Sequence, residues 1–232
     1  STQLFEAKNL KKEEIEVVMS ILSNYVPNCL VKTEVSCSVQ DINSLEPNTT
    51  DFANKIIQAI NIANLDIHRA VTHNKGIMNG IDAVVIATGN DFRAIEAGAH
   101  AYASRNGTYQ SLSNAYIKNK NFYFELTLPM AIGTVGGVTN LHPLVKLALK
   151  ILGNPNSKEL MKIIASVGLA QNFGALRSLV TSGIQKGHMK MHLINLLNKY
   201  ELNEEEKKLA ITYFKNRTVS SSSVENFIQN LR

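Results

Sequence analysis

The chain of 232 residues contains no tryptophan and only two cysteines, Cys29 and Cys37. Two cysteines cannot build the multi-bridge framework of a small disulfide-stabilised protein, so a reducing, cytoplasmic setting is expected. Charged residues are also few, at 19%, whereas hydrophobic residues make up 44%. This balance excludes a largely disordered chain and predicts a globular protein with a substantial buried core.

Long apolar runs and strongly basic stretches are missing as well. No apolar run reaches the roughly 20 residues that a membrane-spanning helix needs, and the N-terminus has no recognisable signal peptide. The formal net charge of +5 suits an anionic ligand. The basic residues are scattered, however, and no RNA-binding aromatic signature accompanies them. We therefore expect no membrane partner and no nucleic-acid partner.

Hydrophobic periodicity predicts several helices. Apolar residues recur at helical spacing over 12–23, over 52–63 after a cap at Thr50, and over 92–104. A longer helix is expected to begin after a capping box of Asn156 and Glu159 and to continue to about Thr181. The small residues of 92–104 would allow another backbone to approach this helix closely.

Alternating residues predict strands. Residues 30–39 alternate along one half-exposed strand, and 113–117 with 122–128 form a hairpin around a polar turn. A short apolar run predicts a further buried strand over 84–87. The glycine-rich segment GTVGG, 133–137, is interpreted as a loop and lacks the GxGxxG spacing of a dinucleotide site.

The end of the chain differs in character. We expect helices near 189–199 and 203–215, then a serine-rich turn and a final short helix capped by Ser222 and Glu225. Gly183 and Gly187 interrupt the pattern before these helices. The pattern predicts a small all-helical appendage joined through a glycine hinge.

The segment THNKGIMNGIDAVVIATGND, 72–91, places charges on either side of the short apolar run. We interpret Lys75 as lying in a glycine-flanked loop and Asp91 in the turn after the strand. A carboxylate beside Lys75 would keep the lysine protonated, so that it could stabilise a developing oxyanion. Two plainer interpretations remain open: Lys75 as a solvated surface lysine, and Asp91 as the cap of the helix that begins at Phe92.

His188 and His192 lie four residues apart and would share a helix face. Such a pair can bind zinc, but the glutamate of an HExxH site is missing and no further ligands are evident. No metal is therefore expected.

Three segments, taken together, resemble a known family. RAVTHNKGIMNGIDAVVIATGNDFRAIEAGAHAYASRNGTY, PMAIGTVGGVTNLHP and VGLAQNFGALRSLVTSGIQKGHMKMH are similar to hydroxymethylglutaryl-coenzyme A (HMG-CoA) reductase of the bacterial class II type and occur in the family's order. The similarity extends from about Met19 to His192. An unrelated oxidoreductase that shares only the glycine loops is improbable with three ordered segments.

The resemblance implies roles for six residues. Lys75 would stabilise the substrate carbonyl oxygen during hydride transfer, and Asp91 would lie beside that lysine and hold its charge and orientation. His188 would protonate the departing coenzyme A thiolate, a role that suits an imidazolium with an ordinary pKa of about 6.5. Substrate binding would involve Arg69, which would hold the carboxylate, and two pocket residues, Asn79 and Gln171.

The implied reaction reduces HMG-CoA to mevalonate and free coenzyme A in the mevalonate pathway of isoprenoid biosynthesis, with two NADH or NADPH and no metal. The resemblance also implies a homodimer with active sites at the subunit interface. The Ala/Gly-rich helix over 92–104 and the apolar hairpin are candidate contact surfaces.

The resemblance implies an α+β fold: a large catalytic domain with a central helix and surrounding sheet and helices, plus a small helical C-terminal flap. We expect 1–23 to be a remnant of the small nucleotide-binding domain, 24–183 the C-terminal part of the large domain, and 184–232 the flap. The family's catalytic glutamate and DAMGAN-type segment have no counterpart here. The chain is therefore expected to be a C-terminal fragment that is inactive alone; the alternative is a non-catalytic CoA-binding or dimerisation module.

Overall fold

The computed structural model describes residues 18–137, 141–181, 183, 192–200, 202–217 and 219–231. The buried hydrophobic side chains form two separate clusters. The larger cluster extends from Val31 to Leu176, and the smaller one from Leu193 to Ile228. We describe the larger cluster as the body and the smaller as the tail. The expected boundaries at 23 and 183 stay a prediction.

The body contains a three-stranded antiparallel sheet in the order β1-β3-β2, with β1 at Leu30–Ser38, β2 at Ser113–Lys118 and β3 at Asn121–Pro129. The predicted strand over 30–39 and the predicted hairpin are therefore confirmed. Asn119 and Lys120, which join β2 to β3, both have positive φ, 51° and 64°. Two such residues are typical of the type I′ turn that matches the twist of a hairpin.

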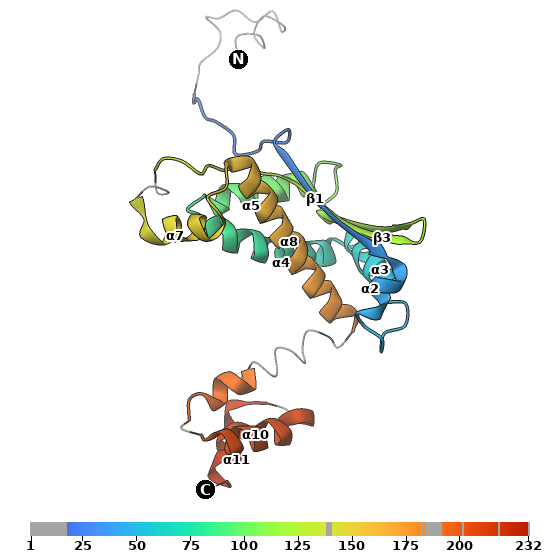
Figure 1. The fold of residues 1–232 in the computed structure, drawn as a ribbon, viewed down its shortest axis with the longest axis vertical. Helices are drawn as coiled ribbons and strands as arrows, with labels where there is room; N and C mark the ends of the chain where they lie inside the picture. The colour runs from blue at the N-terminus through green and yellow to red at the C-terminus, as the bar shows by residue number, and fades with distance from the viewer. Residues whose placement is uncertain are drawn as a thin grey trace, which may run out of the picture.

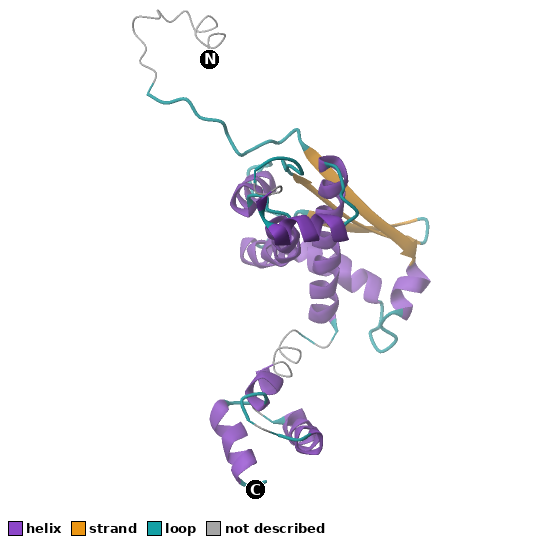
Figure 2. Ribbon diagram, turned by 60° about the vertical axis from the view of Figure 1, so that its left-hand side comes forward, coloured by secondary structure: helices purple, strands orange, loops and turns teal. Residues whose placement is uncertain are grey.

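Helices cover one face of this sheet (Figures 1 and 2). The inner face of β3 is fully buried beneath them, and its apolar side chains are Phe122, Phe124, Leu126 and Leu128. The covering helices are α3 (Phe52–Leu65), α4 (Ile67–Ala87) and α8 (Ser157–Val180). α8 runs through the middle of the body and contacts α3, α4, β1 and β3. The architecture is the α+β fold with a central helix that the resemblance implied.

Glycine allows α4 and α8 to pack closely. A Cβ atom on Gly168 of α8 would lie 2.7 Å from Cγ1 of Ile81 on α4. A Cβ atom on Gly80 of α4 would lie 2.9 Å from the carbonyl oxygen of Val167 on α8. Because neither glycine could carry a side chain without displacing its neighbour, the crossing of the two helices depends on both residues.

The structure contradicts the expected strand over 84–87 and the expected loop around Lys75. Both segments belong to α4, an uninterrupted helix of 21 residues. Ile77, Ile81 and Val85 recur every four residues, so the helix buries them along one face. Burial of this stripe outweighs the modest strand preference of the β-branched run, because intrinsic preferences are weak beside tertiary packing.

Three further helices start at or near the residues predicted for them. α8 begins with the predicted capping box of Asn156 and Glu159. α5 (Phe92–Ala103) occupies the range predicted for it. The N-cap position of α3 is Asp51 and not Thr50. Asp51 has a left-handed backbone conformation, and its side chain makes no capping hydrogen bond. α2 (Val39–Ser44) and α7 (Pro143–Ile151) complete the body.

The expected N-terminal helix over 12–23 is wrong for the residues that the structure describes. Residues 18–23 contain no helix, and residues 12–17 lie outside the described residues. Val18, Met19 and Leu22 are each more than 70% exposed. Among the described residues no surface receives these three side chains, so residues 18–23 gain little from burial as a helix.

The tail contains a helix over 192–197, then α10 (Glu204–Tyr213), the short 3₁₀ helix η2 (Phe214–Asn216) and α11 (Ser221–Gln229). The last helix is capped by Ser220 with Ser223, and not by Ser222 with Glu225. The serine-rich run thus supplies both halves of the capping pair. Gly183 has φ +79°, as a hinge glycine would allow, whereas Gly187 lies outside the described residues.

By length and composition, α8 is also apolar enough to cross a membrane. The central helix of a globular body passes the same test, and α8 buries one face against the sheet and α4. The buried residues of α8 thus account for part of its apolar character.

Candidate functional site

Lys75 and Asn79 lie one turn apart on the exposed face of α4, on the side of the helix away from its buried stripe. Gln171 is exposed on the neighbouring helix α8. A Cβ atom on Gly80 would lie 2.8 Å from Cβ of Gln171, so Gln171 sits beside the residue that follows Asn79. Three of the residues that sequence analysis singled out therefore share one exposed surface across α4 and α8.

The two residues before Lys75 have structural contacts that the sequence analysis did not foresee. His73 is 2% exposed, and its Nε2 lies 2.8 Å from Oγ of Ser113 on β2. The Ser113 hydroxyl in turn donates to Oδ1 of Asn172 on α8, at 2.8 Å. Nε2 of His73 also lies 3.4 Å from the amide nitrogen of Asn172, so both Ser113 and Asn172 border this ring nitrogen. The chain of bonds joins α4, the sheet and α8.

Asn74 is fully buried and closes the loop that precedes β2. Its side-chain amide donates to the carbonyl of Gln110 at 2.8 Å and accepts from the backbone N–H of Leu112 at 3.0 Å. Within HNKG, therefore, the first two side chains fix α4 against the body, and Lys75 alone points to solvent. The buried polar pair holds the face that carries Lys75 and Asn79 in one orientation.

Burial keeps His73 neutral. Desolvation, together with the positive charge of Arg69, lowers the His73 pKa to about 4. Arg69 is half-buried one turn earlier on α4, and burial lowers its pKa as well, although a guanidinium stays charged at physiological pH. Arg69 thus provides a fixed positive charge one turn before His73 on α4.

Asp91 caps α5. Its carboxylate accepts from the backbone N–H groups of Arg93 and Ala94 and forms an ion pair with the Arg93 guanidinium at 3.2 Å. The Arg93 hydrogen bond is the main reason that the Asp91 pKa is lowered. The capping interpretation is confirmed, and the carboxylate remains half-exposed.

The turn before Asp91 is tied to the glycine-rich segment. Oδ1 of Asn90 accepts from the backbone N–H of Gly133 at 2.8 Å, and the Thr88 hydroxyl donates to the carbonyl of Val84 at 2.7 Å. Two segments of the family resemblance, TGND and GTVGG, therefore meet at the C-terminal end of α4. Side chains on Gly133 or Gly137 would meet nothing within 4 Å, so this part of the loop borders open space.

Within one chain, the structure does not bring Lys75 and Asp91 together. The N–H of Asn90 bonds the carbonyl of Val85, so the turn before Asp91 folds against the end of α4. Val85 is ten residues beyond Lys75, which corresponds to about 15 Å along an α-helix. Among the described residues, the Lys75 ammonium has no carboxylate within ion-pairing distance.

The sequence also did not predict a pair of carboxyl groups between α4 and α5. Asp82 and Glu96 lie within hydrogen-bonding reach, and Oδ1 of Asp82 is buried without a partner. Burial and the Glu96 charge raise the Asp82 pKa to about 7. Near neutral pH the pair shares a proton, because two close carboxylates cannot both ionise without cost. No group of three metal-ligating side chains occurs in the part of the chain that the structure describes.

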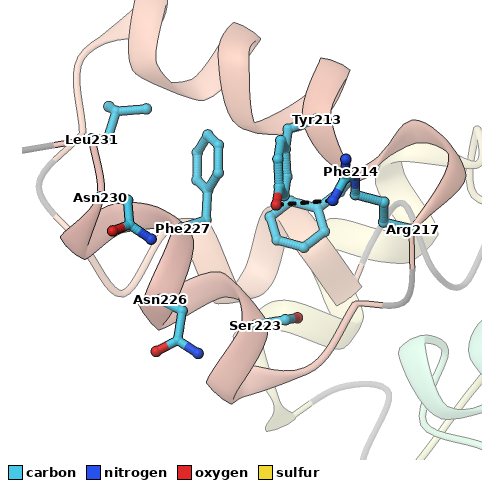
Figure 3. Close-up of a pocket in the computed structure, with 8 residues that line it drawn as sticks. All are labelled: Tyr213, Phe214, Arg217, Ser223, Asn226, Phe227, Asn230 and Leu231. Carbon is cyan, nitrogen blue, oxygen red and sulfur yellow. Dashed lines mark hydrogen bonds between the residues drawn. The ribbon is translucent and has the colours of Figure 1, made fainter.

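His188 lies outside the described residues, and His192 is exposed at the start of the first tail helix. The tail contains a hollow of about 490 Å³ lined by aromatic side chains (Figure 3). The Arg217 guanidinium lies 4.2 Å from the centre of the Tyr213 ring and donates to its hydroxyl at 3.0 Å. Phe227 packs on the same ring, with centroids 4.6 Å apart. None of the five predicted site residues that the structure describes lines this hollow.

The chain is similar in sequence to known proteins of one family. The family model for hydroxymethylglutaryl-coenzyme A reductase matches residues 2–193. The 3-hydroxy-3-methylglutaryl-coenzyme A reductase of Archaeoglobus fulgidus is 54% identical over 142 residues, which cover 61% of this chain and 32% of that protein. A probable 3-hydroxy-3-methylglutaryl-coenzyme A reductase of Borreliella burgdorferi is 40% identical over 199 residues, covering 83% and 46%.

Solved structures of the same family are also similar to this chain. The class II 3-hydroxy-3-methylglutaryl-CoA reductase of Streptococcus pneumoniae, bound to NADPH in open conformations, is 44% identical with a TM-score of 0.68. The match covers 93% of this chain and 53% of that one. A further structure of the Streptococcus pneumoniae enzyme is 48% identical over 69% of this chain, with a TM-score of 0.66. The chain thus spans between a third and about half of the relatives it matches.

Proposed function

Because the chain belongs to the hydroxymethylglutaryl-coenzyme A reductase family, we propose that its α4–α8 surface acts in the nicotinamide-dependent reduction of HMG-CoA to mevalonate and coenzyme A. The observation that supports this most directly is the shared exposed surface of Lys75, Asn79 and Gln171. The buried bonds of His73 and Asn74 hold that surface in a fixed orientation. A positioned donor of this kind is what hydride attack on a thioester carbonyl requires.

Lys75 supplies the charge in this proposal. Its ammonium, which has no carboxylate partner among the described side chains, is free to donate to the carbonyl oxygen as that oxygen becomes negative. Asn79 offers an amide one turn further along α4, and Gln171 offers another from α8. Arg69 adds a positive charge suited to the substrate carboxylate.

The nicotinamide cofactor supplies the hydride, and NADH and NADPH are both compatible with the proposal. The sheet described here is antiparallel throughout, so its strands do not form the parallel crossover of a dinucleotide fold. The proposed contribution of this chain is to hold the thioester, stabilise its oxygen and, through His188, protonate the leaving thiolate.

The distance between Lys75 and Asp91 leads to a second element of the proposal. For Asp91 to lie beside a Lys75 ammonium, the two residues must come from different chains, so we place the active site between two copies in a homodimer. The exposed side of α4 also carries Val71 and Ile86, each more than half exposed, which a second copy would cover. The hairpin suggested earlier as a contact surface is less suited, because the large apolar side chains of β3, Phe122, Phe124, Leu126 and Leu128, are buried in the core.

The test of the proposed function is Lys75→Ala in the complete gene product. We expect kcat with HMG-CoA to fall by about 10²- to 10³-fold, as for other lost oxyanion donors. Lys146→Ala, an exposed lysine on α7, is the matched control and should leave kcat unchanged. Wild-type turnover in Lys75→Ala would refute the assigned role.

A further inference from the structure

β1 is an edge strand with one unpaired side. It pairs with β3 along its full length, from Leu30 opposite Pro129 to Ser38 opposite Asn121. On its other side, no described strand, loop or side chain bonds its backbone. The strand is nine residues long. Native proteins rarely leave an edge of this length open, because its free N–H and C=O groups can pair with any extended chain.

A groove of about 470 Å³ follows this edge on the inner face of the sheet. β1 contributes Thr33, Val35 and Cys37 to one wall, and α8 contributes Leu169, Ala170 and Phe173 to the floor. Glu34 points to the opposite face of the strand but also borders the groove. The groove therefore opens sideways across the edge and is not closed by β1.

The exposure of inner-face side chains shows that the layer is incomplete at this edge. Phe124 on β3 is fully buried, whereas Val35, its partner on β1, is 53% exposed. Both side chains point toward α8, so the difference arises from their position in the sheet. Phe124 has a strand on either side, and Val35 has β3 on one side and open space on the other.

We propose that the free edge of β1 receives an additional β-strand, whose inward side chains fill this groove, and that the strand is supplied by the part of a reductase polypeptide lying outside the portion that this chain matches. The source of the strand rests on the proposed function, whereas the edge and the groove do not. The Streptococcus pneumoniae structure contains about as much chain outside the match as inside it.

The dimensions and charges define the expected strand. From Thr33 to Cys37 the edge extends about 13 Å, which places three alternate inward side chains of a facing strand over the groove. Those three residues should be apolar, because Leu169, Ala170 and Phe173 form the floor. On the outer face, Lys32 bonds Glu125 at 2.7 Å and Glu34 at 3.2 Å, so outward residues of either charge find a partner there. Recognition of this kind combines backbone bonds with side-chain pockets.

A second copy of the chain fits this edge less well. In an edge-to-edge dimer, each β1 would occupy the groove of the other copy. α2 and α8, which form the groove's end and floor, would then meet their counterparts beneath the same joined sheet. A single strand from elsewhere meets no such obstacle.

Cys37 provides a direct probe, because its thiol lines the groove. Cys29 is exposed away from the groove and serves as an internal control in the same molecule. The alkylation rate of each cysteine is measured by mass spectrometry on the folded 232-residue chain. Overlapping synthetic peptides about twelve residues long, enough for a strand, tile the portion of the Streptococcus pneumoniae reductase outside the match.

We expect one peptide, or a few consecutive ones, to slow alkylation of Cys37 by roughly tenfold near saturation, with Cys29 unaffected. Ala170→Glu, which places a charge on the groove floor, should abolish this protection. Ser36→Glu on the outer face of the same strand should retain it. Failure of every peptide to protect Cys37 would overturn the proposal. Protection that grows with chain concentration alone would overturn it in favour of a second copy. Neither result depends on reductase activity, so the proposed function is tested separately by Lys75→Ala.

Discussion

Gly80 on α4 and Gln171 on α8 lie so close together that a Cβ atom on the glycine would be 2.8 Å from the Cβ of the glutamine. The carbonyl oxygen of Val167 would be only 2.9 Å away. Because one of these neighbours is backbone, the clash cannot be relieved by rotating a side chain. The contact that brings Asn79 and Gln171 onto one surface thus requires glycine at position 80.

Replacing Gly80 with alanine should destabilise the protein. We expect the free energy of unfolding to fall by about 1–3 kcal/mol, the usual cost of overpacking a tight contact. Gly76→Ala is a matched control on the same helix, since a Cβ there meets nothing within 4 Å. It should raise stability by about 0.5–1 kcal/mol through helix preference alone. Urea denaturation of both variants measures the two effects, and equal shifts would contradict the packing role.

The contrast between α4 and its neighbours shows what the sequence could predict. Local sequence signals predict three of the elements. α5 follows a cap at Asp91, α8 follows a capping box at Asn156, and the hairpin shows alternation around Phe124. α4 contains glycines and a β-branched run, which locally favour a loop and a strand. Gly80 is required by α8, almost ninety residues further along the chain, and such a distant requirement leaves no local signal.

Only part of the candidate site followed from the sequence. The family resemblance selected Lys75, Asn79 and Gln171, and the structure places them on one surface. The resemblance gave no indication that His73 bonds Ser113, which lies 40 residues further along the chain. Nor did it indicate that Ser113 bonds Asn172, another 59 residues further along. A buried polar network depends on which elements pack together, and hydrophobic periodicity does not report that.

Two buried groups should give opposite pH dependences to stability. The His73 pKa falls from 6.5 to about 4 on folding, so between these values the unfolded chain binds the extra proton. The burial of neutral His73 therefore lowers the free energy of unfolding progressively as pH drops through this range. The Asp82 pKa rises from 3.8 to about 7, so the folded chain binds the extra proton and stability is lost as pH rises. Across about pH 4–7 the two contributions oppose each other.

Single substitutions should separate these contributions. His73→Gln keeps a polar side chain that can bond Ser113 but cannot titrate, so relative to wild type its stability should decrease as pH rises. Asp82→Asn places an amide that cannot titrate beside Glu96, and its stability should increase with pH relative to wild type. Urea midpoints measured from about pH 4.5 to pH 7 provide the comparison. Parallel pH profiles for the two variants would show that neither group titrates as described.

The turn between β2 and β3 should gain stability from glycine. Lys120 has φ 64°, a left-handed conformation that costs an ordinary residue about 1 kcal/mol. Lys120→Gly removes this cost at some expense in entropy, so we expect a net gain of about 0.5 kcal/mol. Lys118→Gly, within β2, should instead lose about 0.5–1 kcal/mol. A thermal melt that shows destabilisation by Lys120→Gly would contradict the left-handed assignment.

The separation of Lys75 from Asp91 within one chain makes the subunit arrangement testable by mixing two inactive variants. Lys75→Ala removes the ammonium, and Asp91→Asn removes the carboxylate charge while retaining a good cap for α5, because asparagine caps as well as aspartate. In a homodimer with shared sites, a mixed dimer has both changes in one site and neither in the other. Random assortment of equal amounts of the two variants should therefore restore roughly a quarter of wild-type activity in the complete gene product. Sites contained within single chains would show no recovery at any mixing ratio, because each chain would keep its own defect.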